Sequence, residues 1–215
     1  DISNSILTPG LIDLHTHVYW GGTSLGIDPD KYCISSGLTT LIDTGSAGPG
    51  NFSGFRKHII EKSRFRILVF LHISHAGIFA FSKDVMVGES ENIRMMDPRS
   101  AIQVIKENQD LIVGVKVRLG KRTSGINGIT PLKFAMEVAQ ECNLPIMAHI
   151  DEAPPSYSDL VKELRPGDIL THCFRPSPNG PLGQNGDILC EVLKARDRGI
   201  LFDVGHGMGS FSFKT

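Results

Sequence analysis

Residues 98–117, PRSAIQVIKENQDLIVGVKV, show the pattern that decides the fold. Apolar residues recur at helical spacing over 98–108, and a run rich in valine and isoleucine follows at 112–117. Residues 131–150, PLKFAMEVAQECNLPIMAHI, repeat the same order of helix and strand. Such alternation predicts an α/β protein whose parallel strands are covered by helices.

The same pattern extends along the chain. We expect helices over 98–108 and 131–142, with Asp97 and Thr130 as N-caps because each directly precedes a first-turn proline. Seven strands are predicted, at residues 11–15, 39–43, 66–73, 112–117, 146–150, 168–172 and 200–204. Periodicity leaves two architectures open, a doubly wound open sheet and a closed (β/α) barrel.

Composition and charge narrow the classes of function. The 215 residues are 40% hydrophobic and 21% charged, which is typical of one globular domain rather than a disordered or fibrous chain. With 22 basic and 23 acidic residues, the net charge is −1, and no run of like charges marks a nucleic-acid or anionic-membrane surface. The longest strongly apolar stretch, 67–73, is far shorter than the roughly 20 residues of a spanning helix. Because no secretion signal opens the chain and no cysteines are paired in sequence, we expect a cytoplasmic protein without membrane or nucleic-acid partners.

Histidines gather where the predicted strands end. Five of the eight histidines lie at or just beyond the carboxyl end of a strand, at positions 15, 17, 149, 172 and 206. Ligands bind at this edge in both α/β architectures. His15 and His17 are separated by one residue, so on an extended chain both side chains point to one face and can bind one cation. The alternative, two solvated loop histidines, fits poorly with the apolar run that precedes them.

Lys116 is the second unusual residue, because it interrupts an apolar strand. Burial of an unpaired ammonium is costly, so the lysine either reaches solvent at the end of the strand or has a specific role. A functional lysine there would have a depressed pKa and act as a base, a Schiff-base amine or a modified metal ligand. The residues alone leave these readings open.

The segment PGLIDLHTH at 9–17 resembles the opening strand of the amidohydrolase superfamily of metal-dependent hydrolases. The likeness continues in chain order through GVKVR at 114–118, IMAH at 146–149 and ILTH at 169–172, which resemble the carboxylated-lysine strand and two later histidine strands. DVGHG at 203–207, with Ser210 and Phe211, is similar to the dihydroorotase-like amidohydrolase/deacetylase branch. The resemblance implies a (β/α)₈ TIM barrel, here incomplete at the C-terminus with about seven strands.

The resemblance also implies two divalent metal ions, expected to be zinc. His15 and His17 would hold one ion and His149 and His172 the other, with a carbon dioxide-derived carbamate on Lys116 bridging them. Two such ions lower the pKa of a bound water and polarise the carbonyl that it attacks.

The family also uses an aspartate at the end of the eighth strand as a proton shuttle, and no residue of this chain matches it. The sequence stops at Thr215, shortly after the seventh strand. Asp151 and Asp203 lie near strand ends but not at that position, so we expect structural roles for both. On this basis residues 9–215 form a barrel that lacks its last strand, and residues 1–8 are a remnant of a preceding β-sandwich.

Candidate substrate contacts follow from the same comparison. Tyr19 stands where dihydroorotases typically have an arginine, which removes a charge-assisted hydrogen bond worth about 1.5–3 kcal/mol. We therefore expect a deacetylase or amidase that cleaves a C–N or ester bond of a small acylated substrate, with a dihydroorotase or other cyclic amidohydrolase as the alternative. His206, Arg118 and Tyr19 are predicted substrate contacts, and Arg175 is a further candidate for binding an anion.

Two readings outside metal-dependent hydrolysis remain open at this stage. One is a truncated, inactive metal-binding scaffold, and the other is a metal-free barrel isomerase or lyase with Lys116 as a Schiff-base amine. The unpaired strand edges of an incomplete barrel would also favour association with another chain, so we expect a homo-oligomer.

Overall fold

All seven predicted strands are present in the structure, a computed structural model that describes residues 3–82, 84–207 and 209–215. The strands form one parallel sheet, and each is hydrogen-bonded to the strand that precedes it in the chain. Their bounds are β1 (Leu11–Thr16), β2 (Leu38–Thr44), β3 (Arg66–His72), β4 (Ile112–Leu119), β5 (Ile146–Ile150), β6 (Ile169–Thr171) and β7 (Leu201–Asp203).

Six α-helices connect the strands. They are α1 (Pro29–Ser36), α2 (Phe52–His58), α3 (Pro98–Glu107), α4 (Thr130–Cys142), α5 (Tyr157–Glu163) and α6 (Cys190–Asp197), with short 3₁₀ turns at Ile60–Lys62, Ile93–Met95 and Gly125–Asn127. Asp97 caps α3 as predicted, since its side chain accepts a hydrogen bond from the Arg99 amide. The prediction for Thr130 was wrong: Thr130 is already helical, and Ile129 occupies the N-cap without a side-chain hydrogen bond. Ile129 itself already has helical backbone angles (φ −86°, ψ −5°), so the helix begins one residue earlier than a Thr130 cap would require.

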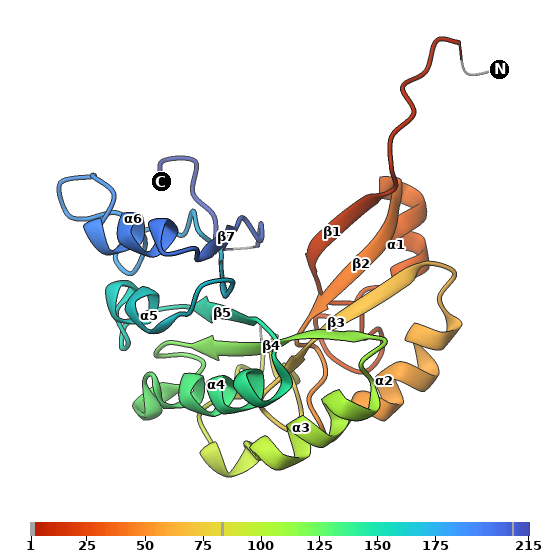
Figure 1. The fold of residues 1–215 in the computed structure, drawn as a ribbon, viewed down its shortest axis with the longest axis horizontal. Coiled ribbons are helices and arrows are strands. Elements are labelled where there is room, and N and C mark those ends of the chain that lie inside the picture. The colour runs from red at the N-terminus through yellow and green to blue at the C-terminus, as the bar shows by residue number, and fades with distance from the viewer. Residues whose placement is uncertain (1–2, 83, 208) are drawn as a thin grey trace.

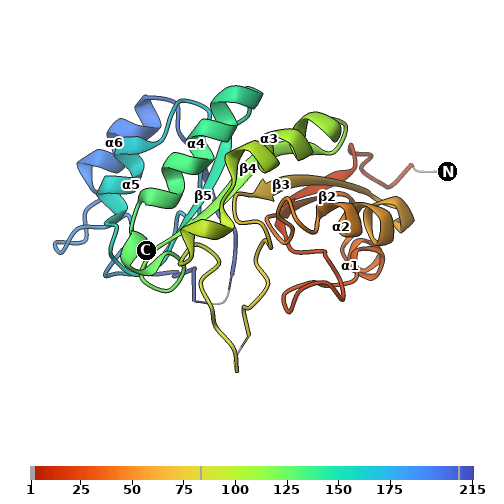
Figure 2. The same cartoon turned by 90° about the horizontal axis from the view of Figure 1, so that it is seen from below.

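The sheet curves into a nearly closed barrel, and the helices follow one another along its outer side in chain order (Figures 1 and 2). A doubly wound sheet reverses its strand order at a switch point, and the continuous order from β1 to β7 contains no such reversal. The barrel alternative is therefore confirmed. No ladder joins β1 to β7 within the described residues, so the seam between them is open.

Strand alternation divides the side chains between two environments. On β4, Val115 and Val117 pack in the large apolar cluster beneath the helices, while Gly114 and Lys116 face the barrel interior. The interior floor is a small cluster around Phe70. A Cβ atom at Gly114 would lie 2.1 Å from the Phe70 ring, so only glycine leaves room for that ring. Within the barrel, this apolar cluster therefore fills one part of the interior, and Lys116 belongs to the polar part that lines the cavity.

Residues 3–8 precede β1 without joining the sheet, and Ile6 and Leu7 are exposed. Residues 1 and 2 lie outside the described residues, so assignment of residues 1–8 to a β-sandwich stays a prediction. Among the described residues, no helix has the length and apolarity needed to cross a membrane.

Candidate metal centre

A cavity of about 370 Å³ opens at the carboxyl ends of the strands, where ligands bind in barrels. Four of the five predicted histidines meet there closely: ring centroids are 5.7 Å apart for His15 and His17, 4.9 Å for His15 and His172, and 4.8 Å for His149 and His172. The cavity is lined by His15, Thr16, His17, Leu25, Ile27, Tyr32, Ile78, Phe81, Lys116, Arg118, His149, His172, Gly205, His206, Gly207 and Ser210. The fold thus brings side chains from β1, β4, β5 and β6 to one place.

Asp203 fixes the orientation of His15. The His15 Nδ1 atom lies 3.0 Å from Asp203 Oδ2, and the Thr171 hydroxyl donates to the same oxygen at 2.6 Å. A carboxylate accepts the Nδ1 proton, which leaves Nε2 of His15 as the free ring nitrogen. Burial raises the pKa of Asp203, but the hydrogen bonds from His15 and Thr171 outweigh it and leave the pKa at about 2. Sequence reasoning gave Asp203 only a structural role; the structure places it in direct contact with a candidate ligand.

His17 and His172 are also held through one ring nitrogen, and His149 differs from them. Nδ1 of His17 lies 3.1 Å from the Ser46 hydroxyl, and Nδ1 of His172 contacts the Gly205 carbonyl oxygen. The Nε2 atom of His149 is buried and has no hydrogen-bond partner among the described residues. Because a buried imidazole nitrogen without a partner is rare, this atom indicates a group that the protein is built to receive.

His172 reaches the cavity through a strained backbone. Alternation along β6 turns Thr171 toward His15, so the next side chain should point outward to the helices. His172 instead has φ of 62°, in the left-handed region that costs a residue other than glycine about 1–3 kcal/mol. This conformation places two consecutive polar side chains on the site.

All four imidazoles are neutral near pH 7. Burial lowers the pKa of His15 to about 4 and that of His172 to about 3, and it lowers the pKa values of His17 and His149 well below the usual range. The nearby Lys116 ammonium acts in the same direction on each of them. Neutral imidazole is the form that binds a metal ion, so the ring nitrogens are ready to act as ligands.

Lys116 is 1% exposed, and its Nζ atom has no hydrogen-bond partner in the described part of the chain. The idea that this lysine extends to solvent is therefore wrong. It lies beside His72 of β3 and Met147 of β5, and a Cβ at Gly45 would be 2.6 Å from its Cγ. Burial, followed by repulsion from Arg118, lowers the pKa of Lys116 to about 7. A large share of the amine is thus uncharged and able to react with carbon dioxide.

The four neutral imidazoles are donors that suit a divalent metal ion. Within residues 3–82, 84–207 and 209–215, no three histidine, cysteine, aspartate or glutamate side chains form a group that holds a metal by themselves. Two imidazoles for each ion, with an anionic group on Lys116 shared between them, would satisfy this arrangement because the lysine supplies the missing ligand. The orphaned atoms, Nε2 of His149 and Nζ of Lys116, support that fit.

The predicted substrate contacts divide into two groups. Arg118 is buried and lines the cavity, and His206 is an exposed residue at its mouth with its ring 4.6 Å from that of Phe211. Tyr19 lies outside the cavity lining, with its ring stacked on that of Phe55 at 4.7 Å, and its contact with substrate stays a prediction. β1 ends at Thr16, so strand alternation no longer directs the side chain at position 19.

Arg175 and Asp151 were also singled out from the sequence, and both lie outside the cavity lining. Arg175 is half-buried and does not line the cavity, although its charge contributes to lowering the pKa of His149. Asp151 has the structural role predicted for it, because its carboxylate accepts hydrogen bonds from the Arg122 amide and the Thr123 hydroxyl.

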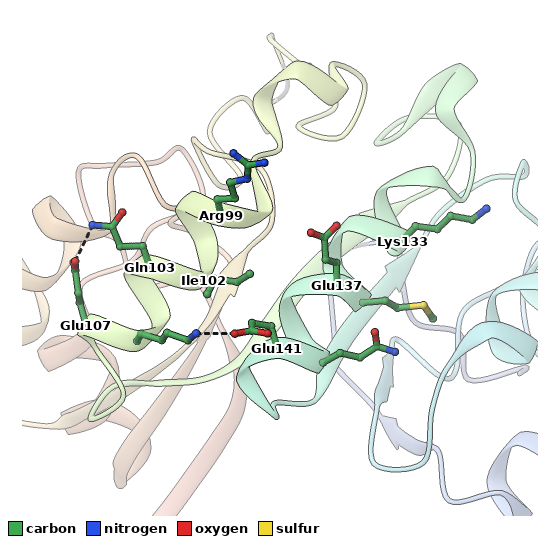
Figure 3. Close-up of a pocket in the computed structure, with 10 residues that line it drawn as sticks. Arg99, Ile102, Gln103, Glu107, Lys133, Glu137 and Glu141 are labelled. Carbon is green, nitrogen blue, oxygen red and sulfur yellow. Dashed lines mark hydrogen bonds and ion pairs between the residues drawn. The ribbon is translucent and has the colours of Figure 1, made fainter.

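A larger hollow of about 1020 Å³ lies between α3 and α4 on the outside of the barrel (Figure 3). Its sides carry exposed charged residues, and Lys106 Nζ pairs with Glu141 Oε1 at 2.7 Å across the helices. Histidine and cysteine are absent from its lining within the described residues. The hollow therefore lacks the imidazoles that gather in the cavity at the strand ends.

Comparisons with known proteins agree with the geometry. The profile of the amidohydrolase family matches residues 6–165. A deacetylase of Agrobacterium fabrum is 38% identical over the whole chain and 52% of its own length, and a deacetylase of Brucella anthropi is 38% identical over 97% of this chain and 51% of its own. Crystal structures of a dihydroorotase (38% identity, TM-score 0.84) and an adenine deaminase (34%, TM-score 0.88) match 96% and 95% of this chain and 54% of each structure. The chain thus spans about half the length of the relatives it matches.

Proposed function

Because the chain belongs to the amidohydrolase family, we propose that it forms part of a metal-dependent hydrolase that removes an acyl group from a small substrate by cleaving a C–N or ester bond. One observation carries this proposal: four neutral imidazoles and an unpartnered buried lysine meet in one cavity at the carboxyl ends of the strands. The deacetylase relatives support acyl transfer to water. The dihydroorotase neighbour keeps a cyclic amidohydrolase as the second candidate.

The chain's own residues have separate tasks in this proposal. His15 and His17 would hold one divalent ion and His149 and His172 the second, and carboxylated Lys116 would serve both; all five residues line the cavity. The ions, expected to be zinc, would lower the pKa of a bound water and polarise the substrate carbonyl. Asp203 keeps the Nδ1 proton on His15 so that Nε2 stays a ligand.

The cavity favours a neutral or anionic acyl compound. No aspartate or glutamate lines it within the described residues, whereas Arg118 does. Arg118 is proposed to bind an anionic group of the substrate, and His206 at the mouth to donate a hydrogen bond to it. Arg118 is the one arginine in the described lining. It is therefore assigned the contact with a substrate anion that dihydroorotases typically make with an arginine at the position of Tyr19.

Metal stoichiometry in the full-length protein tests the proposal. Elemental analysis after supplementation with zinc and bicarbonate is expected to give about two ions per chain. The substitutions Lys116→Ala and His149→Ala should lower that number, whereas His58→Ala, at the end of the outer helix α2, should leave it unchanged. Absence of metal from the supplemented wild type would refute the site.

Hydrolysis is tested separately on a panel of acyl esters and acyl amides. Turnover that disappears with the metal supports the hydrolase. A full-length protein that binds two ions but cleaves no member of the panel would instead be a metal-binding scaffold. A metal-free protein in which borohydride reduces an imine between Lys116 and a carbonyl compound would be a Schiff-base enzyme.

A further inference from the structure

Glu89 is a buried carboxylate that the proposed chemistry does not use. It belongs to the β3–α3 loop (residues 73–97) and is 3% exposed. Its Oε1 atom lies 3.3 Å from Nη1 of Arg118 and 3.4 Å from Nε2 of His72, and its Oε2 atom accepts from the same Nη1 at 3.4 Å. A buried carboxylate is costly unless it is paired, so its place beside a cavity arginine requires an explanation.

The backbone around Glu89 is fixed by the loop that follows β4. The Ser90 amide donates to the Thr123 carbonyl at 2.9 Å, and the Asn127 side chain donates to the Ser90 carbonyl at 3.1 Å. On the other side, a Cβ at Gly88 would lie 2.5 Å from the Thr123 oxygen, so the two loops are in close contact. The backbone on either side of Glu89 therefore packs against Thr123 in the loop that follows β4.

His72 completes this arrangement through its tautomer. Its Nδ1 atom accepts a hydrogen bond from the Ser74 amide at 2.9 Å, so the proton of the neutral ring is on Nε2. That nitrogen is the one that faces Glu89. The N–H edge of His72 is thus 3.4 Å from Oε1 of Glu89, an electrostatic contact rather than a hydrogen bond, because both atoms lack a hydrogen-bond partner within the described residues.

Arg118 is the group that this arrangement controls. It is 6% exposed, lines the cavity, and its Cζ atom lies 4.9 Å from the centre of the Phe81 ring in the same loop. Among the described residues, the hydrogen bond from the guanidinium goes through Nη1 to Glu89, and the residue also lines the cavity. One side of the guanidinium is held, and the other is available to a ligand.

We propose that Glu89, supported by His72, is a positioning residue that orients Arg118 to bind the anionic end of an acylated substrate. This inference rests on the proposed function. Without Glu89, the guanidinium would lose its fixed orientation and the carboxylate that compensates its charge. The effect of losing Glu89 should therefore depend on whether the substrate carries a negative charge.

The test compares Glu89→Gln with the wild-type, metal-loaded, full-length protein on N-acetylglycine and its neutral analogue N-acetylglycinamide. The KM for N-acetylglycine is expected to rise about tenfold, because the variant loses one charge-assisted hydrogen bond. The kcat and the KM for N-acetylglycinamide are expected to change less than twofold. Glu91→Gln, an exposed carboxylate of the same loop, is the matched control and should change neither. If Glu89→Gln fails to fold, Glu89→Asp provides the same comparison with a shorter side chain.

A double substitution shows whether Glu89 acts through Arg118. Glu89→Gln added to Arg118→Gln should cause no further rise in KM for N-acetylglycine, because the residue being positioned is already absent. Additive effects, or equal losses on the charged and neutral substrates, would show that Glu89 only anchors the loop and would overturn the inference.

Binding of 4-oxopentanoate, in which a ketone replaces the hydrolysable amide, separates this inference from the proposed function. Calorimetry should show binding that Glu89→Gln and Arg118→Gln weaken to a similar extent, with 4-oxopentanamide unaffected. If the protein hydrolyses nothing but shows this pattern, the proposed function fails and the positioning role stands. If it hydrolyses the panel and binds the charged and neutral ketones equally well in wild type and variants, the positioning role fails.

Discussion

Replacing Lys116 by methionine should stabilise the metal-free protein, although it removes a residue proposed to be essential for the metal site. The side chains are similar in length, and methionine has no polar atom to leave unpaired in the interior. A fall in the lysine pKa from 10.5 to about 7 corresponds to at most about 5 kcal/mol of lost stability at pH 7. We therefore expect Lys116→Met to raise the free energy of unfolding by a few kcal/mol.

The difference in unfolding free energy between the wild type and Lys116→Met should become smaller as the pH rises. In the unfolded chain the lysine keeps its proton up to about pH 10.5, whereas in the folded chain it loses the proton near pH 7. Between these values the unfolded state binds more protons, so the stability of the wild type rises with pH and approaches that of the variant by about 1.4 kcal/mol per pH unit. Urea unfolding from pH 6.5 to 9.5, in chelator and without carbon dioxide, measures this difference.

Lys121→Met, at an exposed position just after β4, is the control and should change stability by less than about 0.5 kcal/mol. A Lys116→Met protein that is less stable than the wild type at pH 7, or a difference that does not change with pH, would refute the reasoning that Lys116 is buried without a partner.

Three further substitutions test other contacts. Asp203→Asn should weaken zinc binding about 10- to 100-fold in a chelator competition, because the amide does not hold the proton on His15; unchanged affinity would contradict that role. Asp168→Ala should lower the free energy of unfolding in urea by about 3 kcal/mol or more, because this 1% exposed carboxylate pairs with Arg165 at 2.8 Å. A loss below about 1 kcal/mol would show that the pair is dispensable. Tyr19→Phe should leave KM and kcat within about twofold, because the ring packs outside the cavity, and a tenfold rise in KM would return Tyr19 to the substrate site.

Local features of the chain were predictable from the sequence. Strands such as β5 and helices such as α3 depend on apolar spacing and on a capping aspartate, both of which act over a few residues. The choice between a barrel and an open sheet was not predictable from periodicity, because strand order is determined by contacts between distant segments.

The histidines of the site were predicted because they stand at strand ends, and the buried Lys116 because it interrupts an apolar run. Asp203 and Glu89 were missed because their partners are remote: 188 residues separate Asp203 from His15, and 29 separate Glu89 from Arg118. Neither carboxylate has a sequence pattern that predicts such pairing.

The contacts of His15 with Thr171 and Asp203 also bear on the order in which the protein folds. Every strand of the sheet pairs with its neighbour in the chain, so the sheet can grow from the N-terminus as each new strand is added. His15 instead contacts Thr171 and Asp203, which follow it by 156 and 188 positions in the chain. Closing such long segments costs more chain entropy. During synthesis on the ribosome, the surroundings of His15 would therefore be completed only after β7 emerges, so tight metal uptake would follow the addition of β7 rather than precede it.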